Sequence, residues 1–250
     1  MIKFFRKIRQ KLLSENKFSK YLIYAVGEIV LVVIGILIAL QIGQWNKESE
    51  IRELELTILK EISSNLNDDL NQIQGDISLM QVMDTACIKL KNTIYSKNKL
   101  TADFSENASL LRVMPHYQPN ESGYDLLVSK GIATISNDSL RNSISTHYEN
   151  LYTYYKRYED ERFMFHINIS EPKLIEYFSF EFDLDNKYYW NANISLEDYE
   201  KMIGDKSFAK VLKAIESENK QVLSRAIRVE NSIEKQLNFL SNEIQTIEKK

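Results

Sequence analysis

Proline, cysteine and glycine are scarce in this chain of 250 residues, and these scarcities limit the structures that it can form. The three prolines are Pro115, Pro119 and Pro172, so long helices are unobstructed before the first and after the last. Cys87 is the sole cysteine, which excludes a disulfide within the chain. The sequence also lacks internal repeats and low-complexity tracts.

Motifs for catalysis and metal binding are missing as well. His116, His147 and His166 lie far apart, and none has a partner three or four residues away that completes a known metal site. Phosphate-binding loops, nucleophile elbows and HExxH helices are absent. Cys87 occupies an apolar helix position and is expected in the core. We therefore predict no catalytic, cofactor-binding or metal-binding residue, and we do not expect an enzyme.

A long apolar run lies near the N-terminus. Residues 22–40 are nineteen in number, and only Glu28 among them is charged. At about 1.5 Å per residue, this length matches a hydrocarbon core of roughly 30 Å. A soluble core helix would carry a polar face, and a signal peptide would be shorter with a small-residue cleavage site. The sequence predicts a transmembrane signal anchor over residues 21–44. Aromatic rings that favour the membrane interface stand near its ends: Tyr21, Tyr24 and Trp45.

Charge is divided unevenly around this anchor. Residues 1–45 hold 7 basic and 2 acidic groups, net +5, so residues 46–250 hold the remaining 25 and 33, net −8. Basic flanks stay in the cytoplasm, which predicts a cytoplasmic N-terminus and an extracytoplasmic domain over residues 45–250. An acidic domain also argues against nucleic acid as a partner.

The first twenty residues alternate apolar and basic side chains. Ile2, Phe4, Phe5, Ile8 and Leu12 follow a roughly helical spacing. Residues 1–20 are therefore predicted to form a basic amphipathic segment on the cytoplasmic membrane surface, with the lipid bilayer as partner. A disordered basic segment is the alternative.

Small residues are concentrated in the anchor. Gly35, Ala39 and Gly43 are spaced by four, which lets two transmembrane helices approach closely. Glu28 lies about 20° around the helix from Gly35, and Gly27 precedes it. We predict an assembly face through which the span pairs with a second copy or with a partner membrane protein. The alternative is a lone glutamate tolerated near the interface.

The anchor resembles a known group of proteins. Its motif is GEI, then LVVIGILIALQ over residues 31–41, then Trp45-Asn46. Further matches lie in the domain: SGYDLL over residues 122–127, Gly131, Leu140-Arg141 and Tyr148. This pattern resembles a family of uncharacterised bacterial single-span membrane proteins, most of which carry two asparagines where this chain has Gly43-Gln44. The resemblance implies a bacterial inner-membrane protein with a helical domain of unknown function, and it supplies no activity.

Apolar residues recur every three or four positions over residues 51–94, 139–162 and 208–247. Three such stripes must be buried, and an antiparallel helical bundle pairs them. The fold class is thus mainly α, with the transmembrane helix continuing into the bundle to about residue 97. An intermolecular coiled coil is the alternative. Asn137 and Asp138 are capping candidates, and a short extra helix is expected over residues 123–129.

Two stretches have strand period instead. Apolar residues alternate over residues 163–170 and again over 178–185. A small β excursion around 163–184 and a looped aromatic flap both fit this pattern. Residues 98–121 are predicted to be a long connection. Asp68-Asp69 is expected on a solvated helix face. Among five clustered tyrosines, at 148, 152, 154, 155 and 158, Tyr152 and Tyr154 are expected to face away from the core, as a partner surface or as part of an aromatic-rich bundle.

Three functions from different classes fit these features. The first is a membrane-anchored extracytoplasmic interaction or scaffold protein. The second is an accessory subunit of a proton-driven membrane complex that uses Glu28, although such subunits usually carry aspartate and a different outer domain. The third is an enzyme with an unrecognised site.

Overall fold

The computed structural model describes residues 18–97 and 99–249, so most of the predicted amphipathic segment over residues 1–20 lies outside the described residues. The chain forms two compact units, Met1–Leu54 and Glu55–Lys250. Helix α2, Phe18–Tyr95, is 78 residues long and belongs to both units. The predicted continuity from the anchor into the domain is therefore confirmed at the level of secondary structure.

The first unit contains the apolar part of α2. Within the described residues, α2 is long and apolar enough to cross a membrane, and no residue of its most apolar 18-residue window is buried. Large side chains from Leu22 to Ile42 are exposed along it. Length, composition and exposure are consistent with a membrane anchor.

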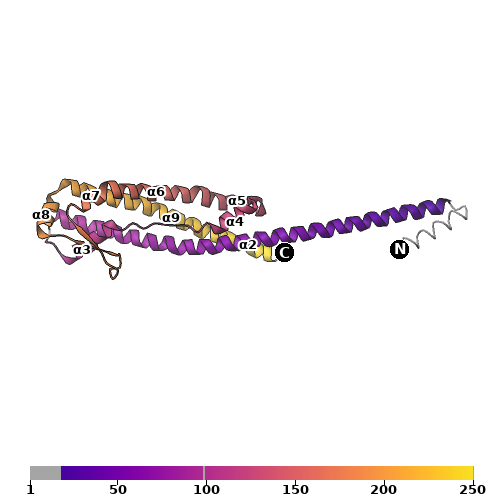
Figure 1. Ribbon diagram of the computed structural model, residues 1–250, viewed down its shortest axis with the longest axis horizontal. Coiled ribbons are helices and arrows are strands. Elements are labelled where there is room, and N and C mark those ends of the chain that lie inside the picture. Colours follow the sequence, from indigo (N-terminus) through magenta and orange to yellow (C-terminus); the bar gives the residue numbers. More distant parts are fainter. Residues whose placement is uncertain (1–17, 98, 250) are drawn as a thin grey trace. The chain divides into compact units, whose positions relative to one another are not determined.

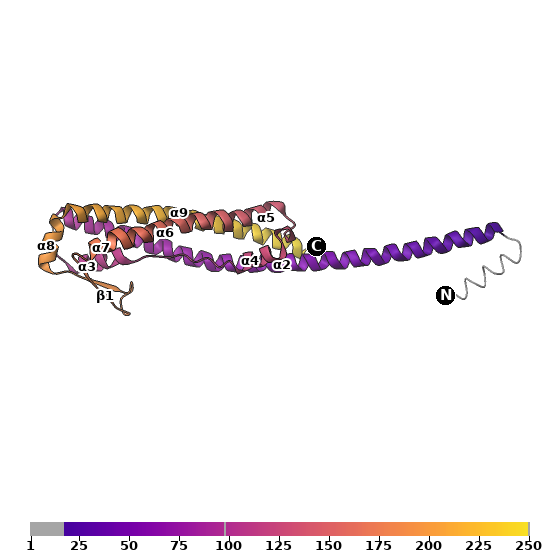
Figure 2. The ribbon, with the colours of Figure 1, turned by 45° about the horizontal axis from the view of Figure 1, so that its top comes forward.

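The second unit is an antiparallel bundle. The later part of α2, the helical run that contains α5 and α6, and α9 (Lys206–Glu248) lie side by side along its length (Figures 1 and 2). Contacts show the direction, because residue numbers rise in α2 as they fall in α9: Lys60–Glu248, Met80–Asn219 and Lys91–Glu216. The run with α5 is antiparallel to α9 by the same test: Asn137–Glu243, Ser143–Gln236 and His147–Ser232.

This middle run is longer than predicted. It comprises α5 (Asp138–Ser145), the π-helical turn η3 (Thr146–Tyr152), α6 (Thr153–Phe165), the π-helical turn η4 (His166–Ser170) and α7 (Glu171–Leu174). The predicted cap is confirmed, since the Asn137 side chain accepts hydrogen bonds from the Ser139 and Leu140 amides.

The prediction of a strand over residues 163–170 is wrong, because these residues are helical. Their alternating apolar side chains do not form a buried strand face: Phe163, Ile167 and Ile169 are exposed. The outward placement of Tyr152 is wrong as well, since Tyr152 is buried. Tyr152 follows Tyr148 by four residues, a spacing that keeps two side chains on one face of a helix, so the two are buried together.

The predicted β excursion exists, with a different second strand. Strand β1 (Ser179–Phe182) pairs antiparallel with β2 (Trp190–Asn193), with Phe182 opposite Trp190. Arg112 lies 4.0 Å from the Trp190 ring centroid and forms a 2.6 Å ion pair with Glu171, which ties the hairpin to α7.

The predicted long connection over residues 98–121 is partly helical. It contains α3 (Ala102–Ser109) and the 3₁₀ turn η1 (Leu110–Arg112). Residues 113–121, which we call the strap, have no helix or strand. After the strap come α4 (Ser122–Lys130), the expected short helix, and the 3₁₀ turn η2 (Ile132–Thr134). Helix α8 (Leu196–Gly204) precedes α9.

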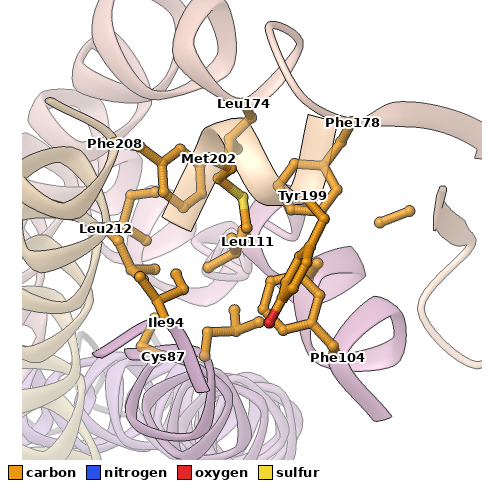
Figure 3. Packing of buried hydrophobic residues seen from close by; sticks show 14 residues of the cluster. Cys87, Ile94, Phe104, Leu111, Leu174, Phe178, Tyr199, Met202, Phe208 and Leu212 are labelled. Carbon is orange, nitrogen blue, oxygen red and sulfur yellow. The ribbon is translucent and has the colours of Figure 1, made fainter. Parts of the chain in front are cut away.

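An aromatic core closes one end of the bundle. Figure 3 shows Phe104, Tyr199, Phe178 and Phe208 converging from α3, α8, the segment before β1, and α9. The Phe104 and Tyr199 rings meet edge to face, with centroids 5.1 Å apart. Cys87 lies in this core as predicted, and burial raises the pKa of its thiol to about 12. It is therefore a packed thiol at neutral pH.

Two helical glycines are expected to respond oppositely to alanine. A Cβ at Gly123 would lie 2.8 Å from the Ile62 backbone nitrogen and 2.8 Å from Asn65 Oδ1. This oxygen accepts a hydrogen bond from the Gly123 amide. Because backbone must move, Gly123→Ala should lower the free energy of unfolding by about 1–3 kcal/mol. At Gly75 an added Cβ meets nothing within 4 Å, so Gly75→Ala should raise it by about 0.5–1 kcal/mol.

Urea unfolding of the full-length chain in detergent measures both variants. A Gly123→Ala protein as stable as the Gly75→Ala protein would contradict the close approach of α4 to α2.

Candidate functional site

The predicted assembly face lies on the exposed part of α2. Among the described residues, an added Cβ at Gly27, Gly35 or Gly43 would meet nothing within 4 Å, and Ala39 is exposed. Trp45 is also exposed, whereas the side chains of Tyr21 and Tyr24 lie outside the described residues. The helix therefore leaves open the small-residue positions at which a second helix would pack.

A different site, in the bundle, is built around the strap. Irregular backbone that packs against helices needs partners for its polar groups, and here buried side chains supply them. Glu159 accepts a hydrogen bond from the Tyr117 amide at 3.0 Å, and Asp69 accepts one from the Asn120 amide at 2.8 Å. Arg162 donates to the Pro115 carbonyl oxygen. Two carboxylates and a guanidinium thus hold three points of the strap.

Tyrosines extend this network inward. The Tyr152 hydroxyl donates to Asp69 Oδ2 at 3.0 Å and accepts from the Tyr117 hydroxyl at 2.9 Å. Tyr155 packs edge to face on Tyr117, with ring centroids 5.9 Å apart. Burial raises the pKa of all three phenols, so they remain protonated, and the Tyr152 hydroxyl serves as the donor to the Asp69 carboxylate.

Burial also changes the ionisation of the charged groups. Loss of hydration raises the pKa of Asp69, Asp76 and Glu159, and it lowers the pKa of Arg162. Among the described residues, Asp76 Oδ2, Glu159 Oε2 and two Arg162 nitrogens, Nε and Nη1, have no hydrogen-bond partner. These groups form an incompletely satisfied charged cluster beneath the strap.

Two clefts open beside this cluster. One, of about 390 Å³, includes Tyr117, Tyr155 and Lys156 in its lining, and the other, of about 350 Å³, includes Pro115, Arg162 and Phe163. Both clefts are lined by His116 and Glu159, whose Nδ1 and Oε2 atoms lie 3.7 Å apart. The site offers a polar surface with aromatic walls that is suited to binding.

The outer tyrosines form a smaller exposed group. Tyr154, expected to face outward, is exposed, and its hydroxyl donates to that of Tyr158 at 3.3 Å. The Arg225 guanidinium lies 3.5 Å from the Tyr158 ring centroid. The outward prediction is therefore confirmed for Tyr154, and Arg225 of α9 packs against the neighbouring Tyr158.

Sequence reasoning missed most of the strap site. Asp69 was expected in solvent, but only 2% of it is exposed, and the structure corrects that prediction. Glu159 and Arg162 follow Tyr155 by four and seven residues, so they lie on the same helix face as this buried residue. Two charged residues therefore stand where the stripe would otherwise be apolar. That substitution is the signal in the sequence that points to a buried polar cluster. Within residues 18–97 and 99–249, no group of three His, Cys, Asp or Glu residues is arranged to hold a metal ion.

The chain matches a known protein family. Residues 28–219 match the model of a family of unknown function, DUF6090. The chain belongs to this family. No curated protein and no solved structure matches it. The DUF6090 region begins at Glu28 and includes the strap, both clefts and the hairpin, so the family unit contains most of the apolar helix together with most of the bundle.

Proposed function

We propose that this chain is a membrane-anchored interaction protein whose helical domain lies in the aqueous compartment opposite its basic N-terminus. One observation carries the proposal: an apolar segment of membrane-spanning length has no buried residue, while the same helix continues as the first helix of a bundle. Such a segment is costly in water and stable in lipid. The net charges of +5 before residue 46 and −8 after it support a cytoplasmic N-terminus, as in a bacterial inner membrane.

The domain supports interaction rather than a defined reaction. Its two clefts carry polar, charged and aromatic groups on a site built from the strap and α6. The backbone of the strap is irregular, so its outer face presents backbone and side-chain groups that a partner protein can contact. We therefore assign the domain a scaffold role, with the strap as its recognition surface.

We further propose that the span pairs with a second copy of itself through Gly35 and Ala39. Both positions are exposed on α2, and small residues allow the close packing that drives association of helices in lipid. Glu28, about 20° from Gly35 around the helix, lies on the same side. A carboxyl group within a membrane is costly, and hydrogen bonding between two helices lowers that cost.

Anchorage and orientation are tested with single cysteines. Leu184 is 76% exposed, and Cys87 is buried with a raised thiol pKa, so the native background reaction is low. A membrane-impermeant maleimide should label Leu184→Cys in intact spheroplasts, and Lys11→Cys only after lysis. The opposite labelling pattern would overturn the orientation, and extraction of the protein by alkaline carbonate would overturn the anchor.

Self-association is tested on the full-length chain in membranes by energy transfer between labelled copies. Glu28→Leu combined with Gly35→Ile should weaken pairing about tenfold, or about 1.4 kcal/mol. Val33→Ile is the matched control, because residue 33 lies about 160° around the helix from residue 35. Equal pairing of all three proteins would refute this interface.

A further inference from the structure

A third cleft, of about 450 Å³, lies between the run that contains α5 and helix α9. Hydroxyl and amide groups line one part of it, including Ser139, Asn142 and Ser232. Arg228 and Lys235 of α9 also line it. No aspartate or glutamate is among its lining residues. This composition is unusual in a segment whose net charge is −8 over residues 46–250.

Among the described residues, both cations lack an acidic partner. Neither Arg228 nor Lys235 forms an ion pair within the part of the chain that the structure describes. Helix spacing explains this, because the residues three and four positions away are polar, aromatic or basic: Ser224, Arg225, Asn231, Ser232, Asn238 and Phe239. Glu230, nearby in sequence, instead accepts a hydrogen bond from Gln74 of α2. The two positive charges are therefore unneutralised at the cleft.

Buried groups beneath the cleft add to its donor character. His147 and Gln236 line it, and each is only 2% exposed. The Ser143 hydroxyl donates to Gln236 Oε1 at 2.6 Å, which leaves the Gln236 amide nitrogen without a partner among the described residues. His147 Nδ1 lies 2.9 Å from the Ser232 hydroxyl, and Nε2 has no partner in the same range. The unpaired Gln236 N–H groups reinforce a positive potential.

We infer that this cleft binds a phosphate group or a similar tetrahedral oxyanion. An oxyanion accepts hydrogen bonds at every oxygen, which matches a lining rich in donors, and arginine and lysine are the usual phosphate partners. The volume exceeds that of the anion alone, so the cleft also has room for a larger molecule that carries the group. This inference goes beyond the proposed interaction role and does not depend on the strap or on pairing of the span.

The test measures thermal protection of the full-length chain in uncharged detergent. Inorganic phosphate is compared with chloride at equal ionic strength, and a second arm compares nanodiscs of phosphatidylglycerol with nanodiscs of phosphatidylcholine. In the variant that combines Arg228→Gln with Lys235→Gln, at least ten times more phosphate should be needed for the same rise in melting temperature. The control pair is Lys201→Gln with Lys210→Gln, which removes the same charge from exposed positions on α8 and early α9.

A soluble ligand is supported if free phosphate protects the original chain and the control variant but not the variant of Arg228 and Lys235. Protection only by phosphatidylglycerol, again lost in the cleft pair, supports a lipid headgroup as the source of the same chemistry. Equal protection by chloride, or equal loss in the control pair, overturns the site. Unchanged melting of the cleft variant in chloride verifies that the variant still folds.

Discussion

Replacing Arg162 by leucine is expected to lower the free energy of unfolding by about 3–5 kcal/mol, the usual cost of leaving buried charges without their counterion. Arg162 is only 4% exposed, and its positive charge lowers the pKa of both Asp76 and Glu159. Its loss also removes the donor to the Pro115 carbonyl oxygen that holds the strap. Asp76 and Glu159 then lose a nearby positive charge, and the buried Pro115 carbonyl loses its donor.

The cost of this change should depend on pH. Burial already raises the pKa of Asp76 and Glu159, and removing Arg162 raises it further, so these carboxyls become neutral more readily in the folded chain. The destabilisation should therefore shrink as pH falls from 8 towards 5. Urea unfolding followed by tryptophan fluorescence measures the destabilisation at each pH.

Arg157→Leu is the matched control, because Arg157 lies on the same helix and pairs with Glu161 in solvent. Solvent screens exposed ion pairs, so this variant should be nearly as stable as the original chain. A loss of less than 1 kcal/mol for Arg162→Leu would show that the cluster is hydrated and not a structural charge network.

His147 should make the domain less stable in acid. Burial lowers the pKa of His147 from its ordinary value of 6.5 to about 4. Between these values the unfolded chain binds a proton that the folded chain does not, so stability falls as pH drops from 6.5 to 4. At 1.36 kcal/mol per pKa unit, the full difference is worth about 3 kcal/mol.

His147→Asn isolates this contribution. Asparagine keeps an amide group near the position of Nδ1, which contacts the Ser232 hydroxyl, but it does not titrate. The relevant quantity is the difference between the two proteins, because the raised pKa values of Asp69, Asp76 and Glu159 give both of them an opposing slope. Parallel curves between pH 7 and 4 would contradict a neutral buried His147.

The strap site illustrates where the sequence was insufficient. Asp69 lies beside Asp68, and a pair of acids on a helix is normally solvated, so its burial was not visible locally. Its partners, the Asn120 amide and the Tyr152 hydroxyl, are 51 and 83 residues away. Tertiary packing alone brings such groups together, and it provides the hydrogen bonds that make burial of a carboxyl tolerable.

Local period was misleading for a related reason. Alternating apolar residues over 163–170 fitted a strand, yet this segment is helical, in α6 and η4, and Phe163, Ile167 and Ile169 are exposed on it. Strand β1 was visible from its own alternation, but its partner β2 was not, because pairing depends on the turn and on packing against Arg112 and α7.

The sequence by itself determined the features that depend on local composition: the membrane-length apolar run, the division of charge, the stripes of α2 and α9, the Asn137 cap and the core position of Cys87. Helix period and hydropathy are properties of neighbouring residues, so they are readable without a fold. The tertiary structure alone decided which charges are buried beneath the strap and which remain unpaired beside α9. Those outcomes depend on contacts between residues distant in sequence, because packing determines both the loss of hydration and the hydrogen bonds that offset it.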